Sequence, residues 1–192
     1  MVDVTAIRRR LEVYANDEDP LTRASNRLAL ILAANQPFYP LYVWWITGKM
    51  DAALALTFIS TPFFLASPWV TKRLSAAGRL YFPAVGALNT FFCASVFGAA
   101  SGVEFFLAPC LVIAALSCRA TERRALAVFV AALLGAFILL HGRFGTPDFL
   151  RGREHYQALL SLNAYSAATL CAIAVWMFSA KGARAGDTPT KP

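Results

Sequence analysis

The stretch RATERRALAVFVAALLGAFILLH, residues 119–141, places three arginines directly before a long apolar run. No charged residue occurs between 125 and 140. A helix that crosses the hydrocarbon of a bilayer needs about 20 predominantly apolar residues, and its cytoplasmic end is typically rich in lysine and arginine. The stretch therefore predicts a membrane-spanning helix over 125–141 whose basic end is cytoplasmic.

Five further apolar windows accompany this one, at 28–47, 52–70, 80–99, 103–118 and 159–179. The chain is 58% hydrophobic and 15% charged, which is too apolar for a soluble domain of 192 residues. We therefore expect an all-α, polytopic membrane protein, with a six-transmembrane-helix bundle over 27–180. Residues 1–26 lack the apolar core of a secretory signal, so we expect a cytoplasmic tail there. Residues 181–192 predict a second, disordered cytoplasmic tail.

The distribution of basic residues predicts the orientation. Fourteen of the eighteen lysines and arginines lie in the two tails and in the second–third and fourth–fifth loops, which this topology puts on one side. That asymmetry predicts a bacterial inner-membrane protein with both termini in the cytoplasm. The net charge of +7 is thus a topology signal. The sequence has no basic, solvated face with interleaved aromatic residues, so it does not predict nucleic-acid binding.

The N-terminal tail contains a short amphipathic pattern. Arginines occupy positions 8–10. Around them, apolar residues recur at helical spacing, at Val4, Ile7, Leu11 and Tyr14. This helix suits an anionic lipid surface, and packing against the bundle is the equal alternative. Asp19 followed by Pro20 predicts an N-cap and the first residue of the next helix.

The stretch AANQPFYPLYVWW, residues 33–45, puts two amides and two prolines inside an apolar window. Proline has no N–H, so two backbone carbonyls lose their helical donors. Either these side-chain amides or a polar group from a neighbouring helix supply the missing donors at a kink, or the kink opens a small polar cavity that binds a ligand. The candidate ligand-binding residues are Asn35, Gln36, Asn89, Thr90 and Asn163. None is charged, which argues against an ion-coupled transporter.

Titratable residues gather around the predicted outer loop. The cluster comprises Glu104, His141, Asp148, Glu154 and His155. We expect Glu104 either at the surface or paired with an outer-loop arginine, and the hypothesis for the pairing is Arg143, Arg151 or Arg153. The spacing of the histidines matches no defensible metal-ligand pattern, so we expect a solvated loop and no metal. The sequence contains no nucleophile elbow, phosphate-binding glycine loop or H-E-x-x-H motif. It therefore assigns no catalytic class, and we expect no cofactor.

Small residues at helical spacing predict close helix packing. They form ridges that include Gly86 and Gly98 on the third helix, Ala131 and Gly135 on the fifth, and Ala168 on the sixth. These ridges favour a compact bundle, with one ridge available for self-association.

Four features carry a family resemblance: the basic tail with its DP start, the turn SGVEFFLAPCL, the inner loop RATERR, and a longer outer loop before LLSLNAYS. Their order resembles the six-helix membrane domains at the front of bacterial class III adenylate cyclases and some sensor histidine kinases. The resemblance implies a receptor or dimerising anchor that passes a change to a cytoplasmic domain. Only KGARAGDTPTKP follows Ala180, so the chain is either a fragment or a protein that works through a partner.

Together these observations predict a membrane sensor, anchor or accessory subunit. Its expected partners are the lipid bilayer and either a larger membrane or cytoplasmic protein or a second copy of the chain. A small-solute transporter or channel is the alternative, and a membrane-embedded enzyme is the third. The ligand cannot be named from the residues.

Overall fold

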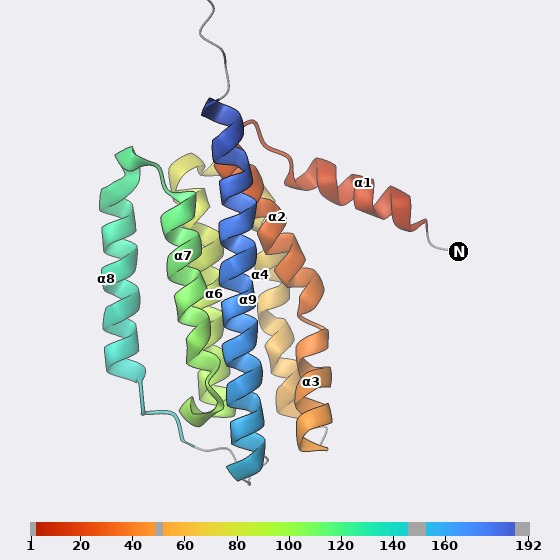
Figure 1. Ribbon diagram of the computed structural model, residues 1–192, viewed down its shortest axis with the longest axis vertical. Helices are drawn as coiled ribbons and strands as arrows, with labels where there is room; N and C mark the ends of the chain where they lie inside the picture. Colours follow the sequence, from red (N-terminus) through yellow and green to blue (C-terminus); the bar gives the residue numbers. More distant parts are fainter. Residues whose placement is uncertain (1–2, 49–51, 146–152, 187–192) are drawn as a thin grey trace, which may run out of the picture.

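The computed structural model describes residues 3–48, 52–145 and 153–186, and within them all regular structure is helical, which confirms the all-α prediction (Figure 1). The chain runs up and down along one axis, and only the first helix projects to the side. The elements in order are α1 (Val4–Ala15), α2 (Pro20–Asn35), α3 (Phe38–Thr47), η1 (Ala52–Ser60, a 3₁₀ helix), α4 (Thr61–Leu65), α5 (Ser67–Arg73), α6 (Ser75–Phe97), η2 (Ala99–Ser101), η3 (Val103–Phe106), α7 (Leu107–Ser117), η4 (Ala120–Glu122), α8 (Arg123–Leu140) and α9 (Arg153–Gly186).

Local chemistry sets the start and end of α2. The Asp19 carboxylate accepts hydrogen bonds from the backbone N–H groups of Leu21 and Thr22, and Pro20 occupies the first turn, as the sequence predicts. The helix ends at Asn35 because Pro37 cannot donate to a carbonyl one turn earlier. The boundary expected at residue 26 thus falls inside a continuous helix.

The second apolar window is segmented. η1, α4 and α5 follow one another over its length, and Pro62 and Pro68 lie in the first turns of the two α-helices. Proline is tolerated there because the first turn of a helix needs no intrahelical donor. Pro83 instead lies inside α6, where the carbonyl of Arg79 loses its usual partner.

Four helical stretches are long and apolar enough to cross a membrane: Leu54–Arg73, Ala77–Phe97, Ala120–Leu140 and Glu154–Ser179. Val103–Ser117 is apolar but shorter, and the first expected span is divided between α2 and α3. The expected count of six spans is therefore not confirmed in the described residues. At the other end of the chain, α9 extends to Gly186, past the boundary expected at 180.

The glycines and alanines predicted at helix contacts differ in how closely other helices approach them. A Cβ added to Gly86 would lie 2.9 Å from the Cys110 Sγ atom, so α6 and α7 approach closely there. Gly98 is also buried. Ala131 and Ala168 are exposed, and nothing lies within 4 Å of a Cβ built on Gly135, so these three do not pack within the chain as expected. The α8 surface instead exposes apolar side chains, which suits a lipid solvent.

Candidate functional site

A cavity of about 110 Å³ lies among α2, η1, α6 and α7, at the break between α2 and α3. Four of the five candidate ligand-binding residues line it: Asn35, Gln36, Asn89 and Thr90. They come from two helices that lie far apart in sequence, and Thr57 of η1 joins them. The remaining wall is largely aromatic and aliphatic, so the cavity offers a few uncharged polar groups in an apolar surround. Ligand binding there stays a prediction.

At the break, the Gln36 carbonyl that Pro40 leaves free and the Gln36 side chain both have hydrogen-bond partners. The Gln36 carbonyl accepts a hydrogen bond from the Tyr39 N–H at 3.3 Å. The Gln36 Nε2 atom donates to Ser60 Oγ at 2.6 Å, across to η1. The described hydrogen bond of this amide thus joins the end of α2 to η1 and does not reach a carbonyl of its own kink.

Asn163 is the candidate that the structure places outside the cavity lining. It is fully buried on α9, where its Nδ2 donates to the Ser101 carbonyl at 2.9 Å and its Oδ1 accepts from the Tyr39 hydroxyl at 3.3 Å. A buried amide whose oxygen and nitrogen both have hydrogen-bond partners stabilises the packing of the elements that it joins. Asn163 therefore ties α9 to α3 and η2.

The outer-loop residues form one pair. His141 Nδ1 lies 2.7 Å from Glu104 Oε2, so the described partner of Glu104 is this histidine and the predicted pairing with Arg143 is wrong. Glu154 is exposed and His155 is half-buried. Asp148 and Arg151 lie outside the described residues, as does the side chain of Arg153. Within the described part of the chain, no three histidine, cysteine or acidic side chains form a group suited to a metal.

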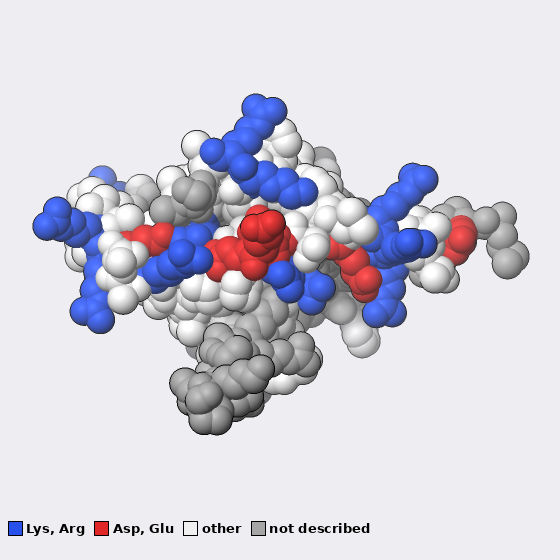
Figure 2. Space-filling view, turned by 90° about the horizontal axis from the view of Figure 1, so that it is seen from above, with Lys and Arg blue, Asp and Glu red and all other residues white. Residues whose placement is uncertain are grey.

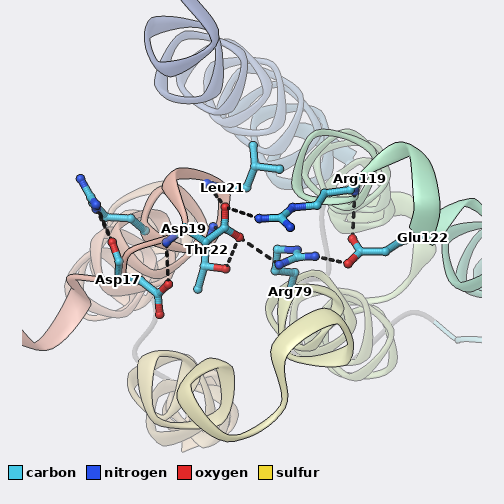
Figure 3. Close-up of polar contacts among 8 residues, drawn as sticks. Asp17, Asp19, Leu21, Thr22, Arg79, Arg119 and Glu122 are labelled. Carbon is cyan, nitrogen blue, oxygen red and sulfur yellow. Dashed lines mark hydrogen bonds and ion pairs between the residues drawn. The ribbon is translucent and has the colours of Figure 1, made fainter. Parts of the chain in front are cut away.

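A second polar site lies at the end of the bundle where α9 finishes, on a face where basic side chains surround several acids (Figure 2). Arg79, whose side chain is only 5% exposed, lies between Asp19 and Glu122 (Figure 3). Its Nη1 donates to Asp19 Oδ2 at 2.9 Å and its Nη2 donates to Glu122 Oε1. Arg119 adds an ion pair with Asp19 Oδ1 at 3.1 Å. We call these four residues the inner ion network.

The inner ion network connects three separate parts of the fold. Asp19 is the N-cap of α2, Arg79 lies in the first turns of α6, and the other two belong to the connection between α7 and α8. The backbone N–H of Arg119 also donates to Glu122 Oε2 at 2.9 Å. Since removal of one member leaves a poorly solvated charge, the network holds these helix ends in one arrangement.

Asp19 makes the network sensitive to acid. Burial alone would raise the pKa of its carboxyl, but hydrogen bonds from Thr22, Arg119 and the Leu21 backbone outweigh burial and hold the pKa below its usual value of 3.8. The folded state therefore favours the carboxylate. Its stabilising contribution is complete above the unfolded pKa and disappears as pH falls through the lower, folded pKa.

We expect this contribution to appear in the pH dependence of thermal unfolding. In detergent, the Tm of the unaltered chain is expected to decrease as pH falls from about 5 to about 2. The decrease is smaller for Asp19→Asn, because asparagine takes up no proton in this range. Asparagine keeps the N-cap, so helix capping is matched. Parallel Tm curves for the two proteins across this range would contradict the assignment.

Between the cavity and the ion network, α2, α5 and α7 carry further buried polar groups. Thr71 Oγ1 donates to Asn26 Oδ1 at 3.1 Å, and both side chains are buried. Among the described residues, Asn26 Nδ2 and the hydroxyls of Ser25, Ser67 and Ser117 have no hydrogen-bond partner. Buried polar groups without partners are costly, so this layer is held less firmly than a fully bonded one.

Sequence reasoning located only part of this site. It predicted Asp19 as an N-cap. It counted Arg79 and Arg119 among the basic loop residues that indicate orientation, but it predicted no partner for either. The available signal was an arginine immediately before the apolar window at 80–99, where a charge entering the bundle needs a partner. The partners lie 60 and 43 residues away, too far for any local pattern to indicate.

The apolar helices and the uncharged central cavity define a helical, membrane-associated protein. Residues 13–188 match the model of the MASE7 family, so the chain belongs to this family of membrane-associated sensor domains. Searches of curated proteins and of solved structures found no match. The family confirms the prediction of a membrane sensor. An association with adenylate cyclases or histidine kinases remains a prediction.

Proposed function

We propose that this sensor domain detects occupancy of its central cavity and transmits the change to the inner ion network, where a partner receives it. The proposed topology has six segments in a bacterial inner membrane, with α2 and α3 forming one broken span and Val103–Ser117 a short one. Both termini and the network are then cytoplasmic, in agreement with the basic side chains on that face.

The observation that carries this proposal is that two helices, α2 and α6, connect the cavity to the network. α6 carries Thr90, Gly86 and Pro83 in the cavity wall and Arg79 in the network. Seven residues separate Gly86 from Arg79, which is about 10 Å along a helix. α2 likewise runs from its N-cap Asp19, in the network, to Asn35 in the cavity wall, so a displacement of either helix at the cavity moves a member of the network.

Pro83 makes α6 deformable between the two sites. Its missing N–H leaves the Arg79 carbonyl without its usual helical partner, and proline is the commonest cause of a kink within a helix. Gly86 adds a close contact with Cys110 of α7 at the same cavity. A ligand that separates α6 from α7 would therefore bend α6 next to Arg79.

The receiving partner is proposed to be a larger membrane or cytoplasmic protein, or a second copy of the chain. α9 is suited to contact it because its 34 residues extend about 50 Å, well beyond the roughly 30 Å of hydrocarbon. In Figure 1 the end of α9 rises above the neighbouring helices, on the side of the molecule that carries α1.

Cys118 is a native reporter for this coupling. It is half-buried at the end of α7, and both Arg79 and Glu122 influence its thiol electrostatically. Filling the cavity with Thr90→Phe is expected to change the rate at which a water-soluble maleimide labels Cys118 by about fivefold or more. Peptide mass spectrometry separates Cys118 from the other cysteines.

Thr90→Val is the matched control, because it removes the hydroxyl without filling the cavity. Ala131→Phe adds the same bulk on the exposed surface of α8. Both are expected to leave the labelling rate of Cys118 unchanged. If Thr90→Phe stays folded and Cys118 reacts at the original rate, the cavity and the network are uncoupled and the proposal fails.

A further inference from the structure

A groove of about 550 Å³ lies beside the α2–α3 break, between these helices and α9. It shares five lining residues with the central cavity: Leu32, Asn35, Tyr39, Phe106 and Leu170. A wall that contributes to both hollows is one layer of side chains thick. The groove opens to the outside of the bundle, and that single layer of side chains separates it from the cavity.

The opening faces the depth of the membrane. Its α9 wall extends from Tyr165 to Ile173, inside the candidate span Glu154–Ser179. Its other wall includes Phe38 and Tyr42 of α3, which are exposed. An occupant of the groove would thus come from the lipid phase, because water is scarce at that depth.

The lining specifies the chemistry of the occupant. No described residue that lines either hollow is acidic, basic or histidine. Three side-chain amides line the cavity, those of Asn35, Gln36 and Asn89, whereas Asn35 is the one amide among the described residues of the groove. The groove is otherwise lined by aromatic and aliphatic side chains, with hydroxyls on its tyrosines and on Ser166 and Thr169. A charged head group would be desolvated without a counter-charge, and a wholly apolar molecule would offer the Asn35 amide no hydrogen-bond partner.

The volumes fit a small head and a longer tail. An apolar cavity of about 150 Å³ holds one benzene, so 110 Å³ accommodates a head of about four non-hydrogen atoms. The groove has five times that volume and follows α9 for more than two turns, which suits an alkyl chain. Asn35 lies at the junction and can reach a group in either hollow.

We propose that the cavity and groove together bind one uncharged, single-chain amphiphile from the bilayer, with its hydroxyl or carbonyl head in the cavity and its chain along α9. This inference rests on the proposed sensing function and names the class of ligand that fills the cavity. Insertion of the head past Leu32 and Phe106 pushes on α2 and on η3, which leads into α7. Asp19 lies at the far end of α2.

The test uses the full chain in lipid nanodiscs and a long-chain alcohol that carries a photoreactive diazirine in its alkyl chain. We expect the probe to cross-link the α9 segment 165–173 and α3. We also expect dodecanol to compete at least about tenfold better than dodecanoate or dodecyltrimethylammonium, since a charged head loses at least about one factor of ten in an uncharged cavity.

Three variants localise the site. Thr169→Trp fills the groove from the exposed side of α9 and is expected to reduce specific labelling about tenfold. Asn35→Leu removes the polar group at the junction and is expected to abolish the preference for dodecanol over dodecane. Ala131→Trp on α8 is the bulk-matched control and leaves the labelling unchanged. Variants are compared only when their Tm and elution profile match those of the unaltered chain.

Labelling that is spread over all lipid-facing helices and insensitive to Thr169→Trp would overturn the binding site. Equal competition by the charged amphiphiles would overturn the ligand class. Either result leaves the response of Cys118 to cavity filling intact, so the failure of this inference is distinguishable from failure of the proposed function. Dodecanol added to the unaltered protein is also expected to shift the Cys118 labelling rate in the same direction as Thr90→Phe.

Discussion

Arg79→Leu is expected to lower the free energy of unfolding by about 3 kcal/mol, a large loss for one substitution. The guanidinium is 5% exposed, and its partners Asp19 and Glu122 are 15% and 14% exposed in their side chains. Without the arginine, both carboxylates keep their burial but lose the buried cation that lies between them. Removing one member of a buried ionic group is costly because the remaining charge is poorly solvated.

The measurement is thermal unfolding in detergent, followed by tryptophan fluorescence. A loss of this size corresponds to a fall in Tm of roughly 6–12 °C for a domain of this length. Arg119→Leu is the matched control: it also removes an arginine from Asp19, but its side chain is 55% exposed, so the expected loss is below about 1 kcal/mol. Equal losses for the two variants would refute the special role of Arg79.

A neutralised network should recover much of the stability. Combining Arg79→Leu with Asp19→Asn and Glu122→Gln removes the stranded charges while keeping the side-chain shapes close to the original ones. Replacing a whole buried ionic group is often neutral, whereas breaking one is not. The triple variant is nevertheless expected to lose the response of Cys118 to Thr90→Phe, because the coupling depends on the charges. The triple variant thereby separates the effect of the network on protein stability from its proposed role in transmitting the change at the cavity.

Gly102→Ala is expected to cost about 2–4 kcal/mol. Gly102 has φ +75°, in the left-handed region that disfavours residues with a Cβ. Its new Cβ would also lie 2.6 Å from Leu160 Cδ1 and 3.2 Å from Leu160 Cα, so α9 has to move away. The backbone strain and the steric clash are independent, which is why the loss exceeds that of an ordinary turn glycine.

Gly142 provides the control, because it has the same φ of +75° but nothing within 4 Å of a built Cβ. Gly142→Ala is therefore expected to cost about 1 kcal/mol, from backbone strain alone. Leu160→Ala in the Gly102→Ala background should restore part of the loss by removing the nearer atom. Both comparisons are read from Tm in detergent. A Gly142→Ala variant as unstable as Gly102→Ala would show that the contact with α9 contributes nothing.

Gly102 and Asn163 together explain how α9 is seated. Gly102 admits the Leu160 side chain, and one turn further along Asn163 donates to the carbonyl of Ser101. The sequence suggested that Asn163 belonged to a ligand site because it is polar at depth. Its complete burial and its two hydrogen-bond partners show why polarity alone was insufficient: a buried amide serves packing as well as binding.

The amino-acid sequence by itself determined the helical class, the membrane setting, the cap at Asp19 and the break before Pro37. Each of these depends on about one to twenty consecutive residues, through hydropathy, a capping hydrogen bond or a missing N–H. Segmentation of the second window was also encoded locally, by Pro62 and Pro68, although the expected uninterrupted span overlooked it.

Only the tertiary structure decided which faces of the helices meet. In lipid, an apolar side chain is equally at home in the core and on the surface, so an apolar helix has no stripe that marks its inner face. The convergence of Asn35, Asn89 and Thr90 on one cavity, and the pairing of Arg79 with Asp19, depend on helix rotations that no local pattern records. They follow from contacts between α2 and α6, which packing alone determines.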